Sequence, residues 1–78
     1  MSHELDEKIK IAETMMLVTA LAAEYLEGMI VYANISGGDA TLTKKTLTKA
    51  DELREYWTER FLVQRDIRNA LDNLKSAC

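Results

Sequence analysis

Two acidic pairs are the residues of this chain whose type and spacing could do chemistry. Glu24 and Glu27 lie three positions apart, and so do Glu52 and Glu55. Residues three positions apart share one face of a helix, so two such pairs on facing helices can hold Mg²⁺ through their carboxylate oxygens. An ion held in this way supports the hydrolysis of a nucleotide pyrophosphate.

The spacing of these pairs is loosely similar to the two acidic motifs of all-α pyrophosphohydrolases of the MazG type, which are oligomeric helical bundles. The likeness covers four residues, and Glu55 stands where those enzymes have aspartate. A helical wheel also directs Glu55 toward solvent. A Mg²⁺-dependent nucleotide pyrophosphohydrolase is therefore an alternative function, whereas we expect a solvated face or ion pairs.

Other groups that could act in catalysis have no partners in the sequence. His3 is the only histidine and Cys78 the only cysteine, so no catalytic triad can be assembled. We expect no enzyme, no cofactor and no metal site. A single cysteine fits a reducing compartment, and the charged start MSHELDEKIKI does not look like a signal peptide. The expected location is cytoplasmic.

A basic cluster raises a second alternative, a helical hairpin that binds nucleic acid. Lys44, Lys45 and Lys49 lie at the start of the second predicted helix. Acidic residues are interleaved among the bases that follow, and the formal net charge is −3. Nucleic acid is therefore not the expected partner.

One strong breaker divides the chain into two helical segments. Gly37 and Gly38 lie within NISGGDAT, and the chain has no proline. We predict a single all-α domain over 1–78, with helices at about 3–35 and 45–76 and a loop at about 36–44. Helices of matched length favour an antiparallel hairpin. The favoured cap of the second helix is Thr48, with Thr43 or Thr46 as alternatives.

Apolar residues follow the first predicted helix in two adjacent stripes of alternating four- and three-residue spacing, the first from Leu5 to Ala33 and the second from Ile11 to Tyr32. Together they form a face too wide for one partner helix to cover, which favours a homodimeric four-helix bundle. The residues 14–33 are long enough to cross a membrane, but Glu24 and Glu27 would lie near its middle, so we expect no membrane span. The predicted interface residues are Met15, Val18, Ala22, Tyr25, Met29, Tyr32, Trp57 and Phe61.

Arg60 and Gln64 interrupt the apolar arc of the second predicted helix. If the hairpin turns within residues 38–44, the numbers of paired residues add up to about 82 to 84. Arg60 then lies beside Glu24 and close to Glu27. We predict a buried ion pair between Arg60 and one of these glutamates, with Gln64 as a further hydrogen-bonding partner. In the alternative, the Arg60 side chain extends along the apolar face to water.

These features favour a small non-catalytic module that binds proteins through its helical surfaces as a homo-oligomer. An adaptor, an inhibitor and a regulator all fit, including the small accessory proteins that phages and mobile elements encode. The expected partners are a second copy of the chain and an unidentified protein.

Overall fold

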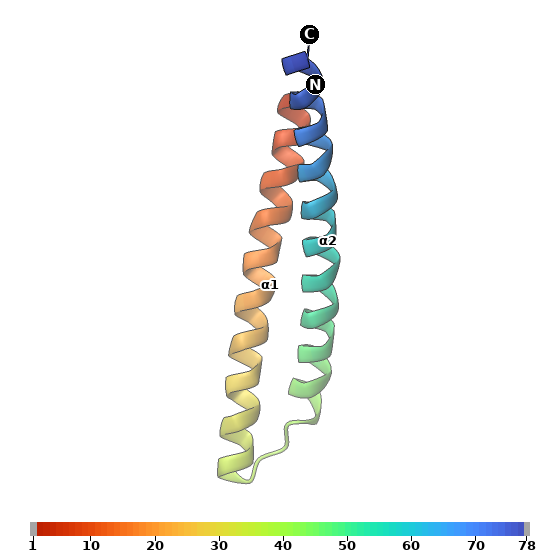
Figure 1. Ribbon diagram of the computed structural model, residues 1–78. Coiled ribbons are helices and arrows are strands. Elements are labelled where there is room, and N and C mark those ends of the chain that lie inside the picture. Colours follow the sequence, from red (N-terminus) through yellow and green to blue (C-terminus); the bar gives the residue numbers. More distant parts are fainter. Residues whose placement is uncertain (1, 78) are drawn as a thin grey trace.

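The chain forms two long helices that lie side by side in opposite directions (Figure 1). The computed structural model describes residues 2–77, with α1 at Ser2–Ser36 and α2 at Thr41–Ala77. The start of α1 and the end of α2 lie at one end of the hairpin, and the loop lies at the other. This confirms the predicted all-α helical hairpin.

The hairpin is a rod of 65 × 15 × 14 Å with a radius of gyration of 18.0 Å. A compact chain of this length has a radius of gyration of about 11.5 Å. The difference means that the single chain has a large surface for its mass, because two helices form only one contact between them.

Glycines end α1 and allow a short loop. Gly37 adopts a φ of 77°, in the left-handed region that favours glycine. The backbone N–H of Gly38 donates a hydrogen bond to the Ala33 carbonyl at 2.8 Å, which closes the last turn in the manner of a Schellman motif. The loop therefore needs only residues 37–40, less than half of the predicted loop at 36–44.

The helix α2 begins at Thr41, four residues before the predicted boundary at 45. The side chain of Asp39 caps this start. Its Oδ1 accepts hydrogen bonds from the Thr41 hydroxyl at 2.7 Å and from the Thr41 backbone N–H at 3.0 Å. These two bonds hold the pKa of Asp39 below its ordinary value of 3.8. The predicted cap at Thr48 is wrong, because its hydroxyl donates to the Lys44 carbonyl inside the helix.

The contact between the helices, which we call the seam, uses the first of the two predicted stripes. Its α1 residues are all buried or half-buried, namely Leu5, Ile9, Ala12, Met16, Thr19, Ala23, Leu26, Ile30 and Ala33. On the α2 side the buried and half-buried residues are Ala40, which directly precedes the helix, and Thr43, Leu47, Ala50, Trp57, Thr58, Phe61 and Gln64 of α2. Within residues 3–76 no large side chain is fully buried, so the hairpin has a seam but little core.

The register of the helices differs from the predicted one because the loop is shorter. Arg68 Nη1 lies 2.9 Å from Asp6 Oδ1 across the seam. The numbers of this pair add up to 74, instead of the predicted 82 to 84. Each residue of α2 therefore faces an earlier residue of α1 than the sequence suggested.

Candidate interaction surface

The second predicted stripe of α1 lies beside the seam and is mostly open to solvent. We call it the α1 flank stripe. Tyr25 is 72% exposed and Tyr32 is 73% exposed, whereas Met15 is half-buried. Six of its residues are classed as exposed, namely Ile11, Val18, Ala22, Tyr25, Met29 and Tyr32. The structure thus brings the predicted α1 interface residues together on one uncovered surface.

Residues of α2 form a matching flank stripe. Tyr56, Arg60 and Val63 directly precede the seam residues Trp57, Phe61 and Gln64, and the same 3-4 spacing extends the stripe in both directions along α2. Its members are all exposed, namely Leu53, Tyr56, Arg60, Val63, Ile67, Ala70 and Leu74. The α1 flank stripe stands in the same relation to the seam on its own helix. Two antiparallel helices are related by a local two-fold axis perpendicular to both, so equivalent positions lie on the same side of the pair. The two stripes therefore form one surface, which we call the joint face.

Two predicted interface residues of α2 lie elsewhere. Trp57 and Phe61 are half-buried in the seam, between the two helices, instead of on an outer face. Tyr56 packs edge-on against Trp57, with 5.1 Å between the ring centroids and 84° between the planes. The exposed aromatic residue of this turn is thus Tyr56, which the sequence-based interface set does not include.

The hairpin does not form the predicted ion pair of Arg60. The Arg60, Glu24 and Glu27 side chains are all exposed, and the ion pairs within residues 2–77 do not include them. The Asp6–Arg68 ion pair gives a sum of 74, and the helix ends at Ser36 and Thr41 give 77, so Arg60 is level with about residues 14 to 17. It is therefore displaced from Glu24 by roughly 10 to 15 Å along the helix. The Arg60 guanidinium carbon lies 5.4 Å from the Tyr56 ring centroid and 5.9 Å from that of Trp57. This is the predicted alternative, a side chain that follows apolar surface to water.

Gln64 is half-buried in the seam without a hydrogen bond to its acceptor. Its Oε1 is buried, and no donor within the described part of the chain reaches it. A buried acceptor without a partner costs about 1 to 3 kcal/mol. Gln64 therefore weakens the seam, and it does not take part in the network that the sequence suggested.

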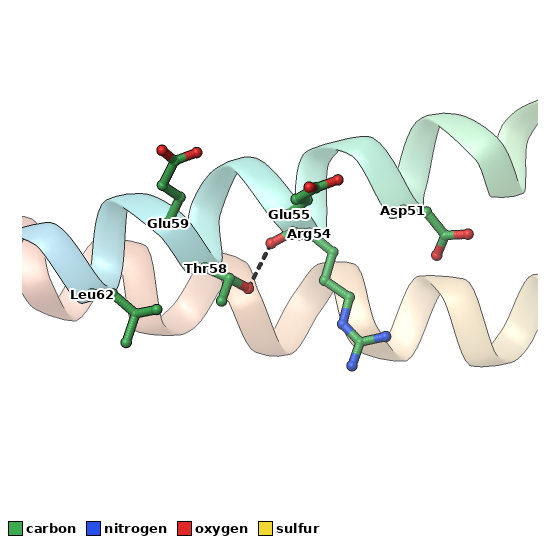
Figure 2. A pocket seen from close by; sticks show the side chains of 6 residues that line it. All are labelled: Asp51, Arg54, Glu55, Thr58, Glu59 and Leu62. Carbon is green, nitrogen blue, oxygen red and sulfur yellow. Dashed lines mark hydrogen bonds between the residues drawn. The ribbon is translucent and has the colours of Figure 1, made fainter.

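The two acidic pairs do not converge. Glu24, Glu27, Glu52 and Glu55 are exposed, and residues 2–77 contain no group of three or more potential ligands close enough to hold a metal ion. Figure 2 shows Glu55 and Glu59 on the side of α2 that points away from α1. They line a shallow groove with Asp51, Arg54, Thr58 and Leu62. The groove mixes carboxylates with one guanidinium and has no enclosed space.

The basic cluster at the start of α2 is exposed along the helix. Lys44, Lys45 and Lys49 all face solvent, and Lys49 Nζ lies 3.7 Å from Glu52 Oε2. An exposed pair of this kind contributes little to stability. It also offsets part of the positive charge that a phosphate backbone would need.

The sequence-based reading missed a third stripe on α1, which we call the back stripe. Its residues are Leu17, Leu21, Glu24, Gly28, Val31 and Ile35. Each of the first five lies two positions before a seam residue, which is about 200° around the helix, so the stripe points away from α2. Its four large side chains are 57% to 81% exposed. The signal was available as a third run of four- and three-residue spacing.

The apolar character of α1 also meets the length and composition criteria for a membrane span. Within His3–Ser36 an 18-residue stretch has a mean hydropathy of 1.4, and 11% of that stretch is buried in the hairpin. A core helix of a soluble protein meets the same criteria. The finding therefore shows that α1 is strongly apolar and that the hairpin covers little of it.

Comparison with known proteins adds no relative to this geometry: no family model, no curated protein and no solved structure matches the chain.

Proposed function

We propose that the protein is a non-catalytic protein-interaction module that works as a cytoplasmic homodimer, with the joint faces of two hairpins packed together as a four-helix bundle. Adaptor, inhibitor and regulator are the roles that such a module performs. The outer surfaces of the bundle then contact a second protein.

The observation that carries this proposal is the surface area of the single chain. It exposes 6146 Å². A compact monomer of 8.9 kDa exposes about 4,800 Å². The excess of about 1,300 Å² is larger than the roughly 800 Å² that each partner buries in a standard stable interface. A second copy removes this excess without any further segment.

The composition of the joint face supports burial in a helical bundle. Val18 and Ala22 are small enough for helices to approach closely, whereas Met29 and Tyr56 supply the volume of a core. Arg60 is the one charged residue on the two flank stripes, and its long side chain can reach the edge of the bundle. Packing two such faces places one apolar layer between four helices.

A lipid bilayer is a less suitable cover for the same helix. Glu24 and Glu27 lie close to the middle of the apolar segment. A charged residue at the centre of a membrane helix costs about 2.5 to 3.5 kcal/mol on insertion scales. In a bundle of hairpins the same carboxylates remain in water, because they lie outside the joint face.

The test is the solution mass, measured by light scattering over a concentration series under reducing conditions. We expect the mass of two or more 8.9 kDa chains for the native protein. Met29→Asp places a charge on the joint face, so it should dissociate the assembly. Leu62→Asp is the matched control, since Leu62 lies on α2 outside the joint face and is already 42% exposed. A native protein that stays monomeric, or an unchanged mass for Met29→Asp, would contradict the proposal.

A further inference from the structure

Near the loop, the joint face ends in an open hollow with aromatic and acidic walls. The hollow has a volume of about 540 Å³ and lies over Gly28, where a Cβ atom would meet nothing within 4 Å. Tyr25 and Tyr32 line it and are 72% and 73% exposed. Glu24 and Asp39 add two carboxylates to its wall. Two aromatic rings and two carboxylates are complementary to a cation on an aliphatic chain, such as a lysine side chain.

The carboxylates of the hollow have no ion-pair partner in the hairpin. The ion pairs within residues 2–77 include neither Glu24 nor Asp39. Hydrogen bonds from Thr41 hold the pKa of Asp39 below its ordinary value, so this carboxylate is charged at neutral pH. Lys44 is close enough to lower this pKa further, but it forms no ion pair with Asp39. The hollow therefore keeps negative charge that a cation from a second copy can neutralise.

Antiparallel packing of two joint faces brings this hollow over the start of α1 in the second copy. A two-fold axis that crosses both rods places α1 on α1, because each helix keeps its side of the face. If the two Ser2–Ser36 helices overlap fully, the numbers of opposed residues add up to 38, as those of the first and last residue do. Residues 28–32, at the centre of the hollow, then face residues 6–10 of the second copy.

The opposed span contains the only two bases of α1, Lys8 and Lys10. Both are exposed, and the ion pairs of the described residues include neither of them. Lys8 also continues the spacing of the α1 flank stripe, so it lies on the side of α1 that faces the second copy. Of the acids in this span, Asp6 is already paired with Arg68 across the seam, which leaves Glu7 against two lysines.

From this match of charge we propose that the two hairpins of the dimer are antiparallel and that the hollow of each receives Lys8 and Lys10 of the other; the inference rests on the proposed dimer. Helical side chains lean toward the N-terminus of their own helix, so Lys8 leans toward Asp39 of the opposite copy. In a parallel pair, the base that continues the α2 flank stripe at the level of the hollow is Lys49. It already lies 3.7 Å from Glu52 of its own helix. Antiparallel packing thus pairs charges that the single hairpin leaves unpaired.

Two variant chains test the contact by exchanging its charges. The double variant Lys8→Glu, Lys10→Glu reverses one side of the contact, and Glu24→Lys reverses the other. Each chain alone should dimerise at least about tenfold more weakly than the native protein, because like charges then meet in both hollows. In an equimolar mixture one hollow has its native charges and the other has them exchanged, so the mixed dimer should regain most of the native affinity. Light scattering over a concentration series measures the affinities, and native mass spectrometry identifies the mixed dimer.

Lys44→Glu is the matched control for these charge reversals. Lys44 is exposed and directly follows the seam residue Thr43, on the side of α2 opposite to its flank stripe, so this variant should not weaken the dimer. The reversed residues are exposed, and circular dichroism should show native helix content in every variant. Variant chains that dimerise as tightly as the native protein, or a mixture that gains nothing over the separate chains, overturn the inference and leave the proposed dimer intact. A native protein that stays monomeric overturns both.

Discussion

The two sides of α1 differ in how completely their side chains are buried. Toward α2 the helix places Ala12, Thr19 and Ala23, which are 1% to 5% exposed. Away from α2 it places Tyr25, Tyr32 and Ile35, which are 72% to 81% exposed. The residues that α1 buries fully are thus small, and its larger seam residues such as Leu26 and Ile30 are only half-buried. Large residues of its other faces lie in water, the reverse of what a self-sufficient core would do.

This difference has an energetic consequence. Apolar burial contributes about 25 cal/mol for each Å² removed from water, so alanine and threonine contribute little when the two helices meet. Most of the apolar area of α1 can contribute only when a further layer covers it. In the proposed dimer, folding of the hairpin is coupled to association, so its stability should depend on protein concentration.

The largest expected effect comes from two neighbouring residues on opposite sides of α1. Leu26 is half-buried in the seam, and Tyr25 is exposed on the flank stripe. Leu26→Ala should lower the free energy of unfolding by about 1 to 3 kcal/mol at every protein concentration, because its contacts lie within one chain. Tyr25→Ala should lower stability mainly at high concentration, where the proposed dimer would form.

Urea unfolding followed by circular dichroism at low and high protein concentration distinguishes the two variants. Equal effects of Tyr25→Ala at both concentrations would mean that the exposed side of α1 is not an association surface. The native chain gives the reference, since its own midpoint should rise with concentration.

Enlarging a buried alanine tests how closely the helices approach. Ala12 is 1% exposed, so Ala12→Leu forces three extra carbon atoms into the seam and should cost about 1 to 3 kcal/mol. Asn69→Leu adds a leucine at an exposed position of α2 and should change stability by less than about 0.5 kcal/mol. Chemical denaturation of both variants checks this, and a tolerated Ala12→Leu would show that the seam is loose.

A smaller effect of opposite sign is expected at Gln64. Its buried Oε1 lacks a donor within the described residues, so Gln64→Leu should stabilise the hairpin by about 1 kcal/mol. Gln64→Glu is the matched variant of similar size, and it should destabilise because it introduces a charge in the same place. A loss of stability with Gln64→Leu would indicate that the side chain has a partner in the assembled state.

The fold could be predicted from the sequence because two local signals agree. The regular spacing from Leu5 to Ala33 defines the α1 side of the seam, and Gly37 with Gly38 locates the turn. The all-α hairpin follows from these signals alone. The start of α2 could not be found in the same way, because Asp39 and three threonines are all chemically able to cap a helix.

The register and the interface set depended on that boundary. A turn placed four residues too late shifted α2 along α1, so Arg60 was set beside Glu24 instead of about 10 to 15 Å from it. A helical wheel also merges neighbouring stripes into one apolar arc, which is why Trp57 was predicted for the interface although the structure places it in the seam. Only the position of the partner helix divides such an arc into a seam and a flank.

The smallest predicted effect lies at the loop, which belongs to neither side of α1. Hydrogen bonds from Thr41 hold the pKa of Asp39 below 3.8, so the ionised carboxylate stabilises the start of α2 above that pH. This contribution is lost as the pH falls through the lowered pKa. Asp39→Asn keeps a capping side chain without the titration, so the melting temperatures of variant and native protein should converge in acid. Melting curves at several pH values measure this difference, which should not change with protein concentration because the cap lies within one chain. Parallel curves throughout would contradict the assignment of the cap to Asp39, and a difference that grows with concentration would mean that the loop takes part in the assembly.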